Sequence, residues 1–248
     1  MPYISQIRDL IIREKSKPIN KLNEFYLSDS QGICRRDILV QWIVAQSSQF
    51  RHSLKTIELA VIYIDTYLNC FNITQQYLQL LGISAYSLAS KFNETEMVSQ
   101  IKLYDSDGQN LYQNGEYDEM EEQIIKVMGF QLNYITSSDY LMAMNIEINE
   151  NIQSLLLFIL LDVDIYKHSH IELALAIVAY SQEKKIQFTN KILQLSQFIH
   201  NKILQAQEIE IDKEQKQDSE SKIRNKQINK KITKNKGMNH QKAPKQSV

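Results

Sequence analysis

The sequence is poor in residues that interrupt helices and in residues that cross-link a chain. Its 248 residues include 3 prolines, 6 glycines and 2 cysteines. So few breakers, in a chain rich in leucine, isoleucine, glutamine, lysine and glutamate, favour helices over sheets. Cys34 and Cys70 are too few for a disulfide scaffold and lack the spacing of a metal site, so we expect a reducing compartment. The composition therefore predicts an all-α protein.

Long apolar runs are missing as well. One of the longest, from Leu155 to Leu161, stops at Asp162 and is far shorter than the roughly 20 residues that a membrane-spanning helix needs. No charged and then apolar segment of the secretory kind opens the chain. We therefore expect a soluble intracellular protein that has no membrane partner and works in the nucleus, the cytoplasm or both.

Catalytic motifs are absent from the sequence too. It has no glycine-rich phosphate loop, no His-Glu-x-x-His and no nucleophile with an evident base. His168 and His170 are two residues apart in a predicted turn, a spacing that could hold a metal but more often does not. Asp105-Ser-Asp-Gly108 resembles part of a calcium loop, but the EF-hand spacing fails and a surface loop is expected. We expect a binding protein without cofactor or metal.

The net charge of −1 hides an uneven distribution. From Lys222 to the C-terminus the chain has lysines and one arginine but no acidic residue, so the part before it is acidic. Residues 206–248 are also too polar to offset the conformational entropy of folding. We predict that they form a disordered basic tail. Two interpretations stay open, a solubilising segment and a nuclear-import or phosphate-binding patch.

The stretch from Leu78 to Lys91 has apolar residues nearly all the way round a helix. Such a helix is buried among others, so we expect it at the centre of a helical bundle. Gly82 costs about 1 kcal/mol against alanine inside a helix, and close packing of a neighbour is the expected reason for it. Apolar spacing predicts further helices over residues 34–50, 54–70, 116–128, 151–163, 171–181 and 189–205, an N-terminal helix from Ile4 that breaks at Lys17-Pro18, and a second turn around Leu22 to Tyr26. The N-cap residues from Thr136 to Asp139 begin a second helical unit.

Several blocks of this sequence resemble the cyclin family, in the family's order. They are Arg35–Trp42 (Arg-Arg-Asp-Ile-Leu-Val-Gln-Trp), Leu59–Asp65, Leu78–Lys91, Lys91-Phe92-Asn93-Glu94, Met120-Glu121 and Val127–Leu132. The resemblance is good from Cys34 to Thr136, weaker to about Leu204 and absent from the tail. It implies an all-α, cyclin-like fold in which a five-helix cyclin box is followed by a second, truncated helical box. The expected domains are an N-terminal helical arm (1–31), a first cyclin box (32–134), a shortened second box (135–205) and the basic tail (206–248).

The resemblance also implies a binding site for a protein kinase. Lys91 matches the lysine, and Glu121 the glutamate, by which cyclins hold their partner. An ammonium group donates to backbone carbonyls and a carboxylate accepts from backbone N–H groups, so the two can fix a loop of any sequence. Four apolar residues match those that receive the kinase's regulatory helix, and they are Phe92, Ile125, Phe130 and Leu132. The alternative is that Phe130 and Leu132 are core residues and Lys91 faces a helix dipole.

Two further sets of residues match the family. Arg36 and Asp65 match an internal ion pair, the alternative being two solvated charges of little energetic weight. Ile38, Leu39, Trp42 and Gln79 match an exposed apolar patch on which kinase substrates dock. Two residues weaken that second match, because Arg35 replaces the family's methionine and Ala45 replaces a glutamate. Trp42 as an ordinary core residue therefore stays open.

The function that the resemblance implies is that of a cyclin, a non-enzymatic regulatory subunit that binds and activates a cyclin-dependent Ser/Thr protein kinase in cell-cycle control. The alternative is a cyclin-fold scaffold, or a transcription-related cyclin-like protein, that activates no cell-cycle kinase. Binding of nucleic acid through phosphate contacts is not favoured, because the excess of basic residues lies in the tail. A pull-down combined with a kinase assay separates these functions.

Overall fold

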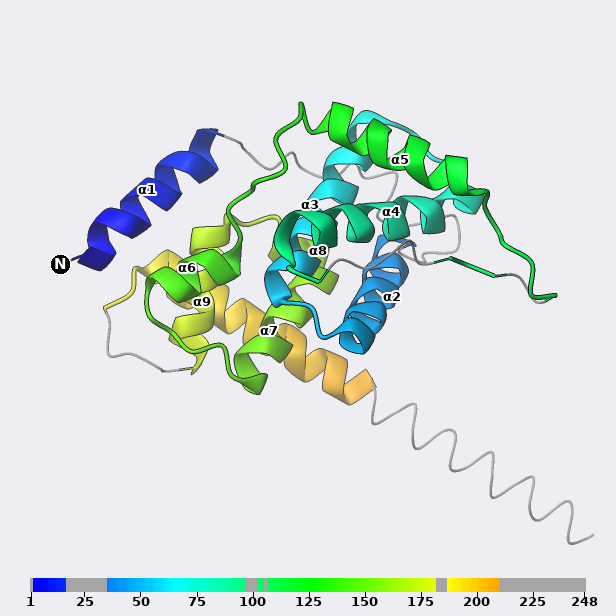
Figure 1. The fold of residues 1–248 in the computed structure, drawn as a ribbon. Helices are drawn as coiled ribbons and strands as arrows, with labels where there is room; N and C mark the ends of the chain where they lie inside the picture. The colour runs from blue at the N-terminus through cyan, green and yellow to red at the C-terminus, as the bar shows by residue number, and fades with distance from the viewer. Residues whose placement is uncertain (1, 17–34, 97–101, 105–106, 182–186, 210–248) are drawn as a thin grey trace, which may run out of the picture. The chain divides into compact units, whose positions relative to one another are not determined.

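The computed structural model describes residues 2–16, 35–96, 102–104, 107–181 and 187–209 (Figure 1). In these residues the secondary structure is helical, apart from one isolated β-bridge between Tyr104 and Asn110. The helices are α1 (Pro2–Ser16), α2 (Arg35–Phe50), α3 (Leu54–Cys70), α4 (Gln75–Asn93), α5 (Asn114–Val127), α6 (Ser137–Ala143), α7 (Glu150–Leu161), α8 (Val163–Tyr166) and α9 (His170–Ser181), and residues 190–209 are helical as well. The all-α prediction is confirmed.

The chain divides into two compact units, Met1–Gln197 and Phe198–Val248. Residues 206–209, the first of the predicted tail, are helical, and the rest of that tail lies outside the described residues. The second helical turn predicted around Leu22 to Tyr26 also lies outside them. Between residues 35 and 127 the described residues hold four helices, α2 to α5, where five were expected, and the segment between α4 and α5 is only partly described.

Helix α3 makes the most varied contacts in the first unit. It packs against α2, α4, α5, α6 and α7, whereas α4 packs against α2, α3 and α5. Helix α4 is buried without interruption from Leu80 to Ser90, as the predicted central helix should be. Figure 1 shows α3 and α4 side by side between α2 and α5. The centre of the bundle is therefore the α3–α4 pair rather than α4 alone.

Gly82 lets α2 approach α4 closely. A Cβ atom built on this glycine would lie 2.4 Å from Cδ1 of Leu39, far inside van der Waals contact. Leu39 is itself 4% exposed and cannot easily move aside, because protein interiors are close-packed. The close packing predicted for Gly82 is confirmed.

Arg36 joins three helices in the interior. It donates from Nε and Nη2 to the two carboxylate oxygens of Asp65 at 2.9 and 2.8 Å, and from Nη1 to the Leu160 carbonyl oxygen at 2.7 Å. Its guanidinium carbon lies 5.2 Å from the centre of the Tyr166 ring. Burial lowers the pKa of Arg36, but the charge and hydrogen bonds of Asp65 outweigh burial and raise it, so the guanidinium stays protonated. Helices α2, α3 and α7 thus meet at one buried cation.

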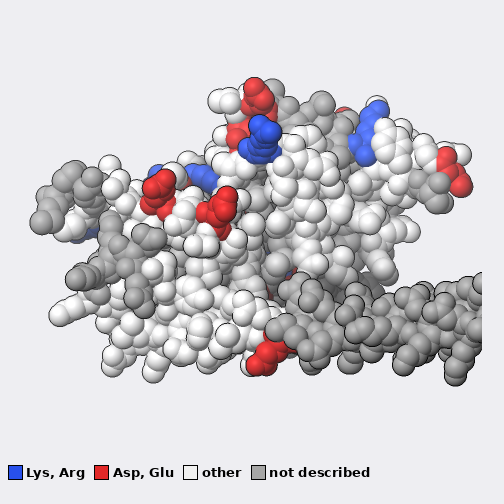
Figure 2. All heavy atoms as spheres, turned by 90° about the horizontal axis from the view of Figure 1, so that it is seen from below, with Lys and Arg blue, Asp and Glu red and all other residues white. Residues whose placement is uncertain are grey.

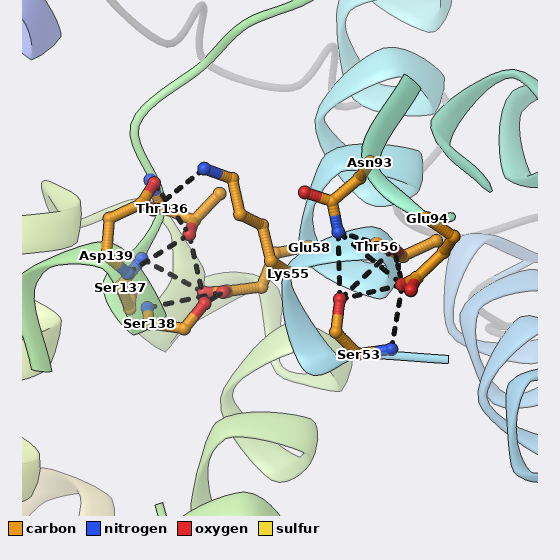
Figure 3. A network of polar contacts seen from close by, with 10 residues as sticks. All are labelled: Ser53, Lys55, Thr56, Glu58, Asn93, Glu94, Thr136, Ser137, Ser138 and Asp139. Carbon is orange, nitrogen blue, oxygen red and sulfur yellow. Dashed lines mark hydrogen bonds and ion pairs between the residues drawn. The ribbon is translucent and has the colours of Figure 1, made fainter. Parts of the chain in front are cut away.

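A second buried contact joins α3 to α6 (Figure 3). The Glu58 carboxylate, 1% exposed, accepts the backbone N–H groups of Ser137 at 3.0 Å and Ser138 at 3.2 Å, and also the Ser138 hydroxyl. Thr136 and Asp139 form a capping box at the same helix end, which confirms the predicted N-cap. Burial raises the pKa of Glu58 to about 7, although hydrogen bonds from Ser138 oppose this shift.

The N-terminal helix α1 is attached to the second half of the unit through Glu14. This carboxylate accepts the Tyr140 hydroxyl at 2.6 Å and the backbone N–H of His170 at 2.7 Å. His170 is buried, its Nδ1 lies 3.1 Å from Ser137 Oγ, and burial lowers its pKa to about 4. Helix α1 therefore contacts both α6 and the start of α9.

Two predictions about missing features can be compared with the described part of the chain. No group of three or more metal-ligating side chains gathers there, and His168 lies beside Glu172, 3.8 Å from Nδ1 to Oε2. Within the same residues, no helix has the length and apolar character to cross a membrane.

Candidate functional site

Lys91 and Glu121, matched on sequence alone, lie in contact. Lys91 is in the last turn of α4 and Glu121 is in α5, and Lys91 Nζ donates to Glu121 Oε1 at 2.7 Å and Oε2 at 2.6 Å. The hydroxyl of Ser87, one turn before Lys91, donates to Oε1 at 2.9 Å. The Lys91 side chain is 36% exposed and that of Glu121 12% exposed. The packing of α4 on α5 thus presents an ion pair at the surface.

The pair keeps unused hydrogen-bonding capacity. An ammonium group has three donor hydrogens, and two of them go to Glu121. A carboxylate has about four acceptor positions, and three are taken by Lys91 and Ser87. Counting the contacts within the described residues, one donor and one acceptor remain, which is what one backbone carbonyl and one backbone N–H group require. A peptide loop could therefore bind without breaking the ion pair.

Phe130 is held in solvent by the turn that follows α5. Gly129 and Phe130 have φ angles of 59° and 61°, and the Phe130 N–H donates to the Ile125 carbonyl at 3.0 Å. A left-handed conformation costs a residue with a side chain roughly 1–2 kcal/mol. The ring gains little burial in return, since Phe130 is 75% exposed. Backbone strain that fixes an exposed side chain is typical of functional sites.

The other matched apolar residues lie close in the sequence to Lys91, Glu121 or Phe130. Phe92 follows Lys91 and is 44% exposed. Ile125 is one helical turn after Glu121, on the same face of α5, and is half-buried. Leu132 is half-buried too, and its carbonyl accepts the Tyr63 hydroxyl at 2.8 Å. Six residues make up what we name the Lys91 surface, and they are Lys91, Phe92, Glu121, Ile125, Phe130 and Leu132.

The residues matched to a substrate-docking patch are not equally accessible. Ile38 is 56% exposed, Gln79 is exposed and Trp42 is half-buried. Leu39 is the exception, since it is buried against Gly82. Leu39 therefore belongs to the core, because the α2 face that carries it is the one in contact with α4, and the expectation that it lines an exposed patch is corrected.

Charged side chains on the described surface are mixed in sign. On the face that Figure 2 draws, lysine and arginine side chains are few and scattered among acidic ones. Phosphate binding requires clustered cations, and that face offers none among the described residues. The arrangement does not favour nucleic acid as a partner of this face.

Three polar residues near the site were not predicted to act there. Ser87 could have been found from its spacing, because it precedes Lys91 by four residues and so shares its helix face. Asn93 and Glu94 were part of the matched block, yet their partners Ser53 and Thr56 are 37 to 41 residues away. No local pattern indicates contacts over such a distance.

Comparisons with known proteins agree with these features. The family model for the N-terminal domain of cyclins matches residues 9–133. The chain is 29% identical to cyclin-A3-3 of Arabidopsis thaliana over 143 residues, which is 56% of this chain and 43% of that protein. It is 31% identical to cyclin-A2 of Gallus gallus over 175 residues, 66% of this chain and 43% of that protein. The matches thus span less than half the length of these relatives.

A solved structure supports the fold. The X-ray structure of a viral cyclin from herpesvirus saimiri superposes with a TM-score of 0.51 at 16% sequence identity. The match covers 81% of this chain and 93% of the viral chain. At this low identity it establishes the arrangement of helices and nothing about partners.

Proposed function

Because the chain belongs to the cyclin family, we propose that it is a regulatory subunit that binds and activates a cyclin-dependent Ser/Thr protein kinase in cell-cycle control. The observation that carries the proposal is the exposed Lys91–Glu121 ion pair, with Nζ to Oε2 at 2.6 Å. Two aromatic residues of the Lys91 surface are exposed as well, Phe92, which follows Lys91 in the chain, and Phe130. A polar anchor beside apolar side chains suits a partner that offers both a loop and a helix.

The polar anchor would hold a loop of the kinase through its backbone. The free donor of Lys91 would bind a carbonyl oxygen and the free acceptor of Glu121 a backbone N–H group. Since the two side chains already restrain each other, little conformational entropy remains to be lost on binding. The anchor would then act with any loop of suitable shape.

The apolar part would select the active kinase conformation. Phe92, Phe130 and the half-buried Ile125 and Leu132 would receive the regulatory helix when it is turned toward the kinase active site. A ligand that binds one of two conformations better shifts the population toward it. In the active conformation a kinase has its catalytic Lys–Glu ion pair formed. The proposed protein would contribute no catalytic group of its own.

The proposal includes the domain organisation expected from the sequence. A first cyclin box over residues 32–134 would carry the Lys91 surface, and residues 135–205 would form a shortened second box. Contacts that support one joined body are those of Arg36 with Leu160 and of Glu58 with Ser137. The nuclear or cytoplasmic location remains a prediction, and any role of the tail lies outside the described residues.

The test is a double substitution, Lys91→Ala with Glu121→Ala. Co-precipitation of a cyclin-dependent kinase and phosphorylation of a model substrate should both be lost, while helical circular dichroism stays unchanged. A matched control is Asp164→Ala with Lys167→Ala, which removes an exposed ion pair of 3.4 Å. Normal activation by the first variant would refute the site. Kinase binding without activation in the wild-type chain would favour the scaffold function instead.

A further inference from the structure

A polar network ties the end of α4 to the start of α3, and Figure 3 shows it from close by. Glu94 is the first residue after α4, and its backbone N–H donates to the Ser90 carbonyl at 2.9 Å. Its Oε1 atom accepts the Ser53 N–H at 2.8 Å, the Ser53 hydroxyl at 2.7 Å and the Thr56 hydroxyl. One carboxylate oxygen thus gathers three donors from the first turn of α3.

Asn93 completes this network, which we name the Glu94 network (Ser53, Thr56, Asn93 and Glu94). Its side-chain Nδ2 donates to Ser53 Oγ at 2.8 Å and to Thr56 Oγ1 at 2.9 Å. Each hydroxyl therefore accepts from Asn93 and donates to Glu94. A network in which every member has its partners fixes a single arrangement of the segments that carry it.

Glu94 places a carboxylate at the N-terminus of α3, beside its N-cap residue. Ser53 is the N-cap residue of α3, but its side chain makes no capping hydrogen bond to that helix. A carboxylate near a helix N-terminus is favoured by the helix dipole and by the unpaired N–H groups there. Partial burial raises the pKa of Glu94, yet the hydrogen bonds from Thr56 and Ser53 outweigh it and lower the pKa overall, so the group is ionised at neutral pH.

We infer that Glu94 is a positioning residue for the Lys91 surface, an inference that rests on the proposed function. Lys91 and Phe92 precede Glu94 by three and two residues, in the last turn of α4. The ends of helices fray unless their terminal groups are held. By fixing residues 93 and 94 to α3, the Glu94 network keeps that last turn helical and keeps Lys91 in reach of Glu121.

The start of α3, to which the end of α4 is bound, is itself held in place by α6. Lys55, in the same first turn of α3, pairs with Asp139 at 2.7 Å, and Glu58 holds the N-terminus of α6. The start of α3 is thus attached to α6 on one side and, through Glu94, to α4 on the other (Figure 3). Loss of Glu94 should loosen α4 without releasing α3 from α6.

A first experiment needs no kinase. Amide hydrogen exchange of the free protein is measured for Glu94→Ala, with Glu96→Ala as the matched control because Glu96 is an exposed glutamate two residues further on. Residues 90–94 should exchange about ten-fold faster in the first variant, while peptides from α7 and α9 keep the wild-type rate. Unchanged exchange at residues 90–94 would overturn the inference.

A second experiment measures the affinity for a recombinant cyclin-dependent kinase that the wild-type chain activates. Glu94→Ala should weaken binding about ten-fold, a change of 1.4 kcal/mol, and Glu94→Gln, which keeps an acceptor oxygen, should recover part of the loss. In the Lys91→Ala background the same substitution should have little further effect, because residues that act together are not additive. A purely structural role of Glu94 would instead lower the kinase affinity by the same factor in the wild-type and in the Lys91→Ala background, and this result would overturn the inference. If the wild-type chain activates no such kinase, the proposed function fails, and the exchange experiment still decides on its own whether Glu94 holds the end of α4.

Discussion

Arg36 and Asp65, 29 residues apart in the chain, form a bidentate ion pair that is buried from solvent. Their side chains are 0% and 3% exposed. The third donor of Arg36 reaches the Leu160 carbonyl, 124 residues away. Buried charges are stable only when paired and hydrogen-bonded, and here one guanidinium satisfies that requirement while it joins α2, α3 and α7.

Replacing Arg36 should therefore unfold the protein readily. Arg36→Leu leaves the Asp65 carboxylate buried without a counter-charge, and we expect a loss of about 3–5 kcal/mol in the free energy of unfolding, measured by urea denaturation. Adding Asp65→Leu removes the stranded charge and should restore part of the stability. If Arg36→Leu cost less than about 1 kcal/mol, the pair would have to be solvated in solution.

Glu58 should make stability depend on pH. Its pKa is about 7 in the folded protein against an ordinary value of 4.5. Between these values the folded state holds a proton that the unfolded state has released, so stability falls as pH rises from about 4.5 to 7 and this contribution is then constant. The difference between these two pKa values corresponds to about 3 kcal/mol in the free energy of unfolding. Lys55, Asp139 and His170 face the same region. Burial lowers the pKa of His170 from 6.5 to about 4, so the unfolded chain holds a proton there that the folded state lacks, and the His170 contribution to stability rises as pH rises from about 4 to 6.5 and opposes that of Glu58.

The measurement compares melting temperatures at pH 5 and pH 8. Over this interval Glu58→Gln, which cannot titrate, should lose less stability than the wild-type protein, or gain more, because the opposing contribution of His170 is the same in both. Glu119→Gln, at an exposed position on α5, serves as the control and should behave as the wild type. Parallel pH profiles for Glu58→Gln and wild type would show that Glu58 is ionised throughout.

Gly82→Ala should destabilise the protein despite alanine's better helix propensity. The substitution gains about 1 kcal/mol in propensity, but the new Cβ would meet Leu39 Cδ1 at 2.4 Å. Overpacking of this kind costs roughly 1–3 kcal/mol, so we expect a net loss near 1 kcal/mol by chemical denaturation. In a Leu39→Ala background the loss should disappear, since the obstructing atoms are gone. An equal loss in both backgrounds would contradict the contact.

The helices were largely predictable from the sequence because their signals are local. The helix predicted over residues 54–70 matches α3, and the N-terminal helix predicted from Ile4 matches α1, whereas the break predicted at Lys17-Pro18 lies outside the described residues. The N-cap at Thr136 was readable for the same reason, since a capping box is contained in four residues. The contact of Lys91 with Glu121 followed from family resemblance and not from spacing.

Features that depend on tertiary contacts could not be predicted in this way. Leu39 was expected at the surface, and only the approach of α4 at Gly82 places it in the core. Nothing near Glu58 in the sequence indicates that its partners are 79 and 80 residues away. The positive φ of Phe130 was hidden for another reason, because left-handed residues are usually glycine, asparagine or aspartate.

Phe130→Gly should raise stability and lower kinase affinity at once. Glycine adopts φ near 61° without strain, which gains roughly 1–2 kcal/mol, less the entropy that glycine adds to the unfolded chain. Little burial is lost because Phe130 is 75% exposed. If the ring contacts the kinase as proposed, the binding free energy should weaken by about 2 kcal/mol, as when an aromatic residue at the centre of an interface is removed. Thermal melting and a binding titration measure the two effects.

Phe71→Gly is the matched control for this last prediction. Phe71 is also exposed, at 52%, but its φ is −135°, so glycine there relieves no strain. Phe71 also packs on Tyr67 with ring centres 5.3 Å apart. The Phe71→Gly substitution should therefore lower stability and leave the kinase affinity unchanged. The two substitutions make the same chemical change, yet they should shift the melting temperature in opposite directions. A destabilised Phe130→Gly variant with full kinase affinity would mean that the ring supports the fold and takes no part in binding.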